Sequence, residues 1–196
     1  MSGKTPSDAR GLQEGDLAPD FEAQTHAGTP FRLREQRGRW VVLYFYPRDH
    51  TPGCTREACG FRDRHDALEQ LGAVVAGVST DSVASHARFV QKQRLPFVLV
   101  SDPEAVVCRR YGVRGPKRFM GRTREGTLRT TFLIDPEGRI RRIWRQVRPD
   151  GHADEVLATL RRLQSGEVES RGGPKAGAGR SGRGRVGKGG GSGAEG

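Results

Sequence analysis

The stretch WVVLYFYPRDHTPGCTREACGF, residues 40–61, changes its hydrophobic pattern part-way along. Its first seven residues form a nearly continuous apolar run, which is typical of a β-strand covered on both faces. After Pro52, apolar residues recur at positions 54, 58, 61 and 68, the spacing of one face of an α-helix. Proline is favoured in the first turn of a helix, so the sequence predicts a buried strand that leads into a helix beginning close to Pro52.

The same alternation continues along the chain. Two further apolar runs, AVVAGVST (73–80) and FVLVS (97–101), are expected to be strands beside the first. Helical periods follow them at residues 82–94 and 103–112. This order of strand, helix and strand indicates a sheet with parallel strands at its centre.

The pattern becomes antiparallel towards the end of the chain. LRTTFLID (128–135) and RIRRIWRQ (139–146) flank the turn signal PEG, which predicts a hairpin. An amphipathic helix is expected over residues 152–163. We therefore predict an α/β fold with a central mixed β-sheet flanked by helices.

The composition of the two ends differs from that of the middle. We expect residues 12–164 to form one domain and residues 1–11 to be a flexible N-terminus. In residues 165–196, 13 of 32 residues are glycine, which predicts a disordered Gly/Arg-rich tail because so few apolar groups can be buried. Its arginine-glycine segments lack the aromatic residues that stack on RNA bases, so an inert tail is favoured over a tether to nucleic acid.

The formal net charge of +11 is not gathered in one run. Residues 12–164 contribute +7 (26 basic, 19 acidic), and the interspersed signs favour an arginine-rich solvated surface. No stretch reaches the ~18 to 20 apolar residues of a membrane helix, and residues 1–13 lack the apolar core of a signal peptide. We expect a cytoplasmic protein without membrane contact, in which three cysteines argue against a disulfide scaffold.

Cys54 is placed to be a nucleophile. It falls within the first turn of the predicted helix, where unpaired backbone N–H groups and the positive end of the helix dipole favour an anion. Cysteine reacts as the thiolate, so this position suits a reactive sulfur.

Cys59 follows Cys54 by five positions, a wider interval than the C-x-x-C of zinc knuckles and thioredoxin-type motifs. In an α-helix this interval separates the Cα atoms by ~8.6 Å, whereas a disulfide needs ~4.4–6.8 Å. If the two cysteines bond, the start of the helix must unwind. Gly53 and Gly60 bracket the segment and weaken its helical preference.

Pro47, Thr51 and Cys54 spell P-x-x-x-T-x-x-C, which resembles the active-site motif of the peroxiredoxins. The run TPGCTREACGFRD, with its second cysteine, is similar to the bacterioferritin comigratory protein, or PrxQ, subfamily. The stretch FMGRTREGTLRTTFLIDPEGRI (119–140) resembles the one that brings in the active-site arginine of this family, here Arg129.

Other segments resemble the family in the same order along the chain. GDLAPDF (15–21) is similar to its opening strand, and GVSTDS (77–82) is similar to the end of its second strand. SDPEAVVCRRYGV resembles the helix before a later loop. The resemblance extends over roughly residues 12–163.

The resemblance implies a thioredoxin-like fold and a peroxidase that reduces hydrogen peroxide and organic hydroperoxides without metal, haem or flavin. Cys54 would be the peroxidatic cysteine, and Thr51 would hydrogen-bond the thiolate and the peroxide. Arg129 would hold the thiolate and stabilise negative charge on the peroxide oxygens, while Pro47 would shield the sulfur from water. Cys59 would be the resolving cysteine, giving an intramolecular disulfide that a thioredoxin-type reductant reopens. A monomer is favoured because resolution can occur within one helix.

Alternatives remain for the sulfur chemistry. Cys108, on an apolar helix face, is expected to be inert, but it is the alternative resolving cysteine. A zinc site would combine Cys54 and Cys59 with His50 or His65, although no second ligand pair follows downstream. A thiol-disulfide oxidoreductase would normally use C-x-x-C.

Plainer roles are also open for the other site residues. Thr51 could cap the helix, and Arg129 could be a solvated strand arginine. Glu57 either orients Arg129 or complements the helix dipole in the first turn. His50 is expected to be a surface imidazole or to modulate the thiolate. A second hypothesis of another class is a polyanion-binding protein that acts through residues 165–196, with secondary peroxidase activity.

Overall fold

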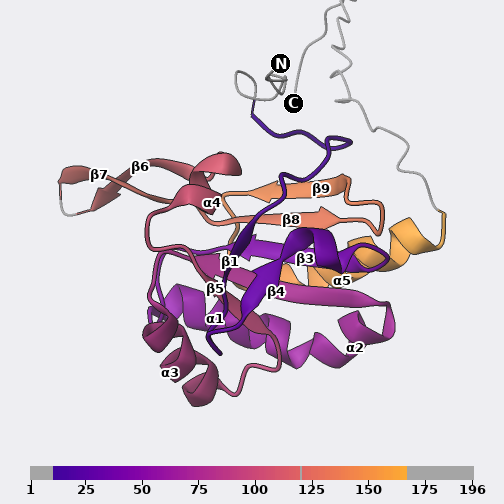
Figure 1. Ribbon diagram of the computed structural model, residues 1–196, viewed down its shortest axis with the longest axis horizontal. Helices are drawn as coiled ribbons and strands as arrows, with labels where there is room; N and C mark the ends of the chain where they lie inside the picture. Colours follow the sequence, from indigo (N-terminus) through magenta and orange to yellow (C-terminus); the bar gives the residue numbers. More distant parts are fainter. Residues whose placement is uncertain (1–10, 120, 167–196) are drawn as a thin grey trace, which may run out of the picture.

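The computed structural model describes residues 11–119 and 121–166, whose arrangement is shown in Figure 1. The strands are β1 (Glu22–Gln24), β2 (Pro30–Arg32), β3 (Trp40–Phe45), β4 (Ala73–Ser79), β5 (Val98–Ser101), β6 (Arg114–Phe119), β7 (Arg122–Thr127), β8 (Thr130–Ile134) and β9 (Ile140–Arg145). The helices are η1 (Leu33–Gln36), α1 (Pro52–Asp63), α2 (His65–Gln70), α3 (Val83–Gln93), α4 (Val106–Arg110) and α5 (His152–Gln164). The expected flexible N-terminus and Gly/Arg-rich tail lie, apart from Gly11, Ser165 and Gly166, outside the described residues.

The central sheet has five strands in the order β5-β4-β3-β8-β9. β3 pairs in parallel with β4, and β4 with β5, whereas β8 runs antiparallel to both β3 and β9. The parallel centre and the antiparallel hairpin at one edge confirm the predicted mixed sheet. Short hairpins, β1–β2 and β6–β7, lie outside it.

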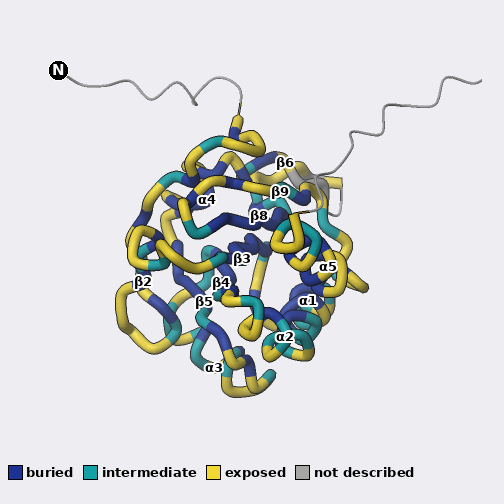
Figure 2. The backbone as a smooth tube through the Cα atoms, turned by 90° about the vertical axis from the view of Figure 1, so that its right-hand side faces the viewer, coloured by how far each residue is buried: buried dark blue, intermediate teal, exposed yellow. Residues whose placement is uncertain are grey.

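Strand β3 is apolar throughout because both faces of the sheet are covered. Val42 and Tyr44 pack with the helices α1, α2, α3 and α5 on one face. Val41, Leu43 and Phe45 point to the opposite face, which α4 and the N-terminal segment cover. Figures 1 and 2 show the four helices together on one side of the sheet and α4 on the other. The site described below lies on the side with four helices.

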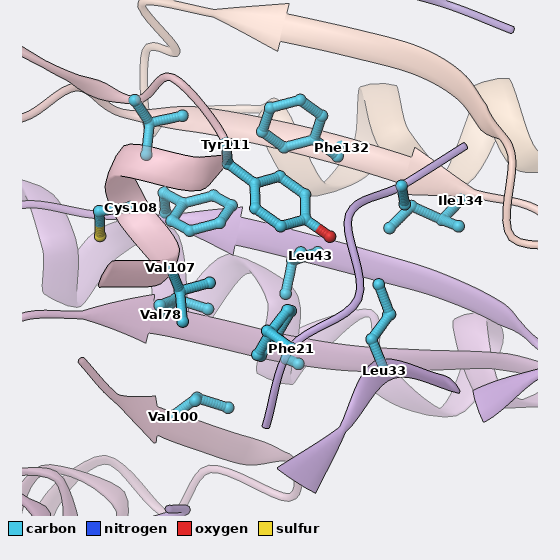
Figure 3. Packing of buried hydrophobic residues seen from close by; sticks show 14 of the residues in the cluster. Phe21, Leu33, Leu43, Val78, Val100, Val107, Cys108, Tyr111, Phe132 and Ile134 are labelled. Atoms are coloured by element: carbon cyan, nitrogen blue, oxygen red, sulfur yellow. The ribbon is translucent and has the colours of Figure 1, made fainter. Parts of the chain in front are cut away.

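The opposite face has a core of its own (Figure 3). Tyr111, which follows α4, packs edge-on against Phe132 of β8, with ring centroids 5.1 Å apart. Its hydroxyl donates a hydrogen bond of 2.8 Å to the carbonyl of Pro19, which fastens the N-terminal segment to this core. Cys108 lies in the same cluster and is fully buried.

The structure differs from the sequence-based expectations at several element boundaries. The helical pattern that starts at Cys54 is broken at Arg64, whose backbone (φ −111°, ψ 3°) separates α1 from α2. Residues 103–112 contain only the five-residue helix α4, because Ala105 adopts a left-handed conformation just before it. Residues 15–21 form no strand, and only Leu17 makes an isolated bridge, to Arg139. Within the described part of the chain, no helix has both the length and the apolar character needed to cross a membrane.

Candidate active site

The topology brings two distant segments together at the end of β3. β3 leads through residues 46–51 into α1, and its last residue, Phe45, pairs with Thr130, the first residue of the antiparallel neighbour β8. Arg129 therefore enters the sheet beside the loop that leads to Cys54. Antiparallel pairing thus brings Arg129 close to Cys54, although the two are 75 positions apart in the sequence.

Cys54 is the third residue of α1 and is 1% exposed. Arg129 donates a hydrogen bond from Nη2 to its Sγ atom at 3.3 Å. A side chain at Gly53 would place its Cβ only 3.3 Å from the same Nη2, so the glycine leaves room for the guanidinium. The sulfur thus sits in the first helical turn with a cation against it, an arrangement that favours the thiolate.

Glu57 lies one turn further along α1 and holds the other side of the guanidinium. Its Oε2 accepts a hydrogen bond from Arg129 Nη1. The side chain is 0% exposed, and burial raises the pKa of this carboxyl to about 7 against the lowering effect of Arg129. Of the two roles considered for Glu57, the contact matches orientation of Arg129.

Thr51 and Pro47 occupy the loop before α1. Thr51 is the N-cap residue by position, but its side chain makes no capping hydrogen bond. Its hydroxyl instead donates a hydrogen bond of 3.1 Å to the carbonyl of Arg48. Since the proton is committed there, the lone pairs of the hydroxyl are available to accept a hydrogen bond. Pro47 is half-buried in the same loop.

Cys59 and Cys54 lie in the same unbroken helix, and both are free thiols. Cys59 is partly exposed, and its Sγ lies 3.7 Å from Oε1 of Gln93 at the end of α3. At a separation of five helical residues, the Cα atoms are ~8.6 Å apart, beyond the range of a disulfide. The folded helix therefore keeps the two sulfurs from bonding.

The other candidate residues have different surroundings. Cys108 is on the opposite face of the sheet, where burial raises the pKa of its thiol to about 12. His50 is exposed and packs its ring against Phe89, while His65 lies beside Phe97. Among the described residues, no group of three or more histidine, cysteine, aspartate or glutamate side chains could hold a metal ion, so the zinc alternative has no ligand set there.

The sequence did not reveal a buried polar network that joins the loop before α1 to helix α3. Asp49 and His86 are 4% and 0% exposed and lie within hydrogen-bond distance of each other. His152, in contact with Phe61 and Trp144, was missed as well. The signal for His86 is its position on the apolar face of the predicted helix 82–94, where a polar residue needs a buried partner.

Comparison with known proteins bears on the class of this site. The family model described as the AhpC/TSA family matches residues 15–143. The chain belongs to the AhpC/TSA family. Its relatives include a Coxiella burnetii protein named as a bcp peroxiredoxin, 48% identical over 76% of this chain and 99% of that protein. The peroxiredoxin Bcp of Bacillus subtilis is 43% identical over 76% of this chain and 96% of its own length.

Solved structures place the chain in the same group. The PrxQ of Xylella fastidiosa, as a cysteine-to-serine mutant, is 39% identical, covers 78% of this chain and 98% of that chain, and superposes with a TM-score of 0.74. The bacterioferritin comigratory protein of Xanthomonas campestris, studied for alkyl peroxide reduction, is 42% identical over 73% of this chain and 91% of that chain, with a TM-score of 0.70. The chain is thus a peroxiredoxin of the Bcp/PrxQ type, a thiol peroxidase with a thioredoxin-like fold, as the motif P-x-x-x-T-x-x-C predicts.

Proposed function

We propose that this peroxiredoxin reduces hydrogen peroxide and alkyl hydroperoxides with Cys54 as the peroxidatic cysteine. The observation that carries the proposal is the hydrogen bond of 3.3 Å from Arg129 to Cys54 in the first turn of α1. A thiolate there is stabilised by the guanidinium and by the helix terminus.

In the first step the Cys54 thiolate attacks the hydrogen-bearing oxygen of the O–O bond, and an S–O bond forms. The O–O bond breaks, its electron pair leaves on the other oxygen, and the alkoxide or hydroxide takes a proton from solvent to become alcohol or water. The sulfur is oxidised to a sulfenic acid. Thr51, whose own proton is held by the Arg48 carbonyl, accepts the hydrogen bond of the bound hydroperoxide. Arg129 stabilises the charge that develops on the peroxide oxygens, while Pro47 narrows access to the sulfur.

In the second step Cys59 resolves the sulfenic acid. Its thiolate attacks the Cys54 sulfur, an S–S bond forms as the S–O bond breaks, and the sulfenic oxygen leaves as hydroxide, which takes a proton from solvent to become water. Because α1 keeps the sulfurs apart, its first turns must unwind beforehand. A dithiol reductant of the thioredoxin type then reduces the disulfide and returns both thiols.

Three serine variants test the assignment of the cysteines. We expect Cys54→Ser to abolish thioredoxin-linked peroxide consumption, measured by stopped-flow with NADPH. Cys59→Ser should retain a single rapid oxidation of Cys54 and stop at the sulfenic acid, detected by mass spectrometry after one equivalent of peroxide. Cys108→Ser, the matched control, should turn over like the wild type. Full activity of Cys54→Ser would overturn the proposal, and undiminished turnover of Cys59→Ser would move resolution to Cys108 or to a second molecule.

We further propose a cytoplasmic monomer. The monomeric state rests on a resolving step that needs one helix and no second subunit. Light scattering of the reduced and oxidised forms at micromolar concentration measures the oligomeric state, and a stable dimer in either form would contradict it. The polyanion-binding alternative concerns a tail whose residues 167–196 lie outside the described part of the chain, and no observation favours it.

A further inference from the structure

One peptide unit of the loop between β3 and α1, the one joining Arg48 to Asp49, is hydrogen-bonded at both of its polar atoms. The carbonyl of this unit, on Arg48, accepts the hydrogen bond of the Thr51 hydroxyl at 3.1 Å. Its N–H, on Asp49, donates to Oδ2 of Asp81 at 2.9 Å. Whatever fixes this peptide therefore also fixes the direction of the Thr51 hydroxyl. Next to it, His50 has a positive φ of 59°, which a non-glycine residue adopts at a cost unless its surroundings impose it.

The side chain of Asp49 joins this peptide to the buried side chains around it. It is 1% exposed and accepts hydrogen bonds from Tyr46 Oη at 2.7 Å and from Ser85 Oγ at 2.8 Å. Nδ1 of His86 lies 2.9 Å from its Oδ2. Three donors surround one carboxylate. Burial acts to raise the pKa of Asp49, but the interactions with His86, together with the hydrogen bonds of Tyr46 and Ser85, hold it below its usual range.

His86 faces acceptors on both sides of its ring. Nδ1 faces the Asp49 carboxylate, and Nε2 lies 3.2 Å from the carbonyl oxygen of Val100 in β5. A neutral imidazole would point a lone pair at one of these oxygens, whereas an imidazolium donates to both. The other titratable groups around His86 are Tyr46 and, across the sheet edge, His26, whose pKa is lowered first by burial and then by the charge of His86.

We propose that Asp49 and His86 are positioning residues for the peroxidase site. Their buried ion pair holds the Arg48–Asp49 peptide and, through it, aims the Thr51 hydroxyl at the peroxide. The inference rests on the proposed function, because it acts through the role given there to Thr51. Neither residue contacts Cys54 through any hydrogen bond that the structure shows, so the pair acts on peroxide recognition more than on the sulfur.

The test compares two reactions of Cys54. One is the stopped-flow reaction with hydrogen peroxide, which uses the Thr51 hydroxyl, and the other is alkylation by iodoacetamide, which needs only an accessible thiolate. We expect Asp49→Asn to slow the peroxide reaction at least about 10-fold, the rate equivalent of losing about one net hydrogen bond to the peroxide. Alkylation should change by less than about 3-fold on the same scale. Asp135→Asn is the matched control, since Asp135 has the same 4% exposure but lies at the β8–β9 turn.

A double-mutant cycle separates positioning from general structural damage. If Asp49 acts through Thr51, Asp49→Asn should cost the peroxide rate no more than about 2-fold in a Thr51→Val background. Independent, multiplying losses would overturn the proposal, and so would equal slowing of both Cys54 reactions. If Asp49→Asn does not fold, Ser85→Ala carries the same comparison with the ion pair intact, with an expected loss of about 3-fold in the peroxide reaction alone.

Nitrogen-15 NMR of the histidine rings of the full chain, assigned by His86→Asn, tests the charge directly. Protonation of both His86 nitrogens at pH 7 supports the ion pair, and a neutral tautomer overturns it. These outcomes are distinct from failure of the proposed function. In that case wild-type Cys54 would itself react slowly with peroxide, whatever the state of His86.

Discussion

Arg129 is the residue on which the geometry of the site depends. Its planar guanidinium reaches Cys54 with one nitrogen and Glu57 with another, and Gly53 provides the space for it. Lysine has a single charged nitrogen and cannot make two bonds in this fixed fork. A lysine at this position would therefore lose either the contact with Glu57 or the contact with Cys54.

Replacement of this arginine should therefore be severe even when the charge is kept. We expect Arg129→Lys to slow the reaction of Cys54 with peroxide about 100-fold, in the range found when one charge-stabilising donor is lost. Stopped-flow measurement with excess peroxide gives the rate. Arg141→Lys is the control, because Arg141 is half-exposed and pairs with Asp135 at 3.3 Å outside the site. A loss of less than about 5-fold in Arg129→Lys would show that charge alone is sufficient.

At the scale of elements, α1 has to be folded while Cys54 reacts with peroxide, and its first turns have to unwind before Cys59 can react. Its first turns make buried contacts through Cys54 and Glu57, and on the surface an ion pair of 3.0 Å joins Arg56 to Asp150. A Cβ at Gly53 would also touch Pro149. Exposed ion pairs contribute at most about 1 kcal/mol, so this ion pair adds little to the free energy of unwinding the segment. The break at Arg64 separates it from α2, which stays on the core through Leu68.

A substitution at Gly60 can shift the equilibrium between folded and unwound α1 without changing either cysteine. A Cβ there would meet Ala153 of α5 at 3.5 Å, an ordinary contact, so alanine fits. Alanine stabilises a helix interior by up to about 1 kcal/mol relative to glycine. We expect Gly60→Ala to slow disulfide formation about 2- to 5-fold. A quenched-flow time course resolved by mass spectrometry measures both steps. Oxidation of Cys54 in the same variant should keep the wild-type rate, and an accelerated second step would argue against unwinding.

The sequence predicted most elements of the central sheet but not all their limits. The run at residues 40–46 was decisive because both sheet faces are buried, which leaves few polar positions in β3. The break at Arg64 was missed because the apolar spacing continues from Phe61 to Leu68 across it. The β1–β2 and β6–β7 hairpins were missed because their strands are short or rich in polar residues.

Within the site, the local motif was readable and the distant partnerships were not. Pro47, Thr51 and Cys54 lie within eight residues, so spacing alone could connect them. Asp49 and His86 are 37 positions apart, and only the folded sheet shows that they meet. Glu57 falls on the inward face of α1 by helical spacing, but its full burial follows from packing that the sequence does not specify.

At the scale of the whole molecule, two buried groups on the same side of the sheet oppose each other in acid. Glu57 has a pKa raised to about 7 by burial, so between pH 4.5 and 7 the folded state holds a proton that the unfolded state has lost. Stability therefore falls as pH rises through that window. His152 has a pKa lowered to about 4 by burial, so between pH 4 and 6.5 only the unfolded state holds its proton. That effect makes stability rise with pH.

These two effects should nearly cancel in the wild type between about pH 4.5 and 6.5. We expect Glu57→Gln to reveal a free energy of unfolding that rises by roughly 1.4 kcal/mol per pH unit there, and His152→Gln one that falls by a similar amount. Urea unfolding at pH 4.5, 5.5 and 6.5 measures the three slopes. Slopes of the same sign in both variants would contradict the opposed burial of these groups.

Because the sheet separates Cys108 from the other two cysteines, Cys108 can serve as an internal standard when their oxidation is measured. Cys108 is a residue of α4, on the face of the sheet away from Cys54 and Cys59, and is fully buried, which raises the pKa of its thiol to about 12. Little thiolate forms at such a pKa, so an oxidant added to the folded protein should leave this sulfur reduced. Once the protein is denatured, every cysteine that is still a thiol becomes open to alkylation. The labelled Cys108 peptide can then serve as an internal standard, against which the oxidised fractions of Cys54 and Cys59 are counted in the same spectrum.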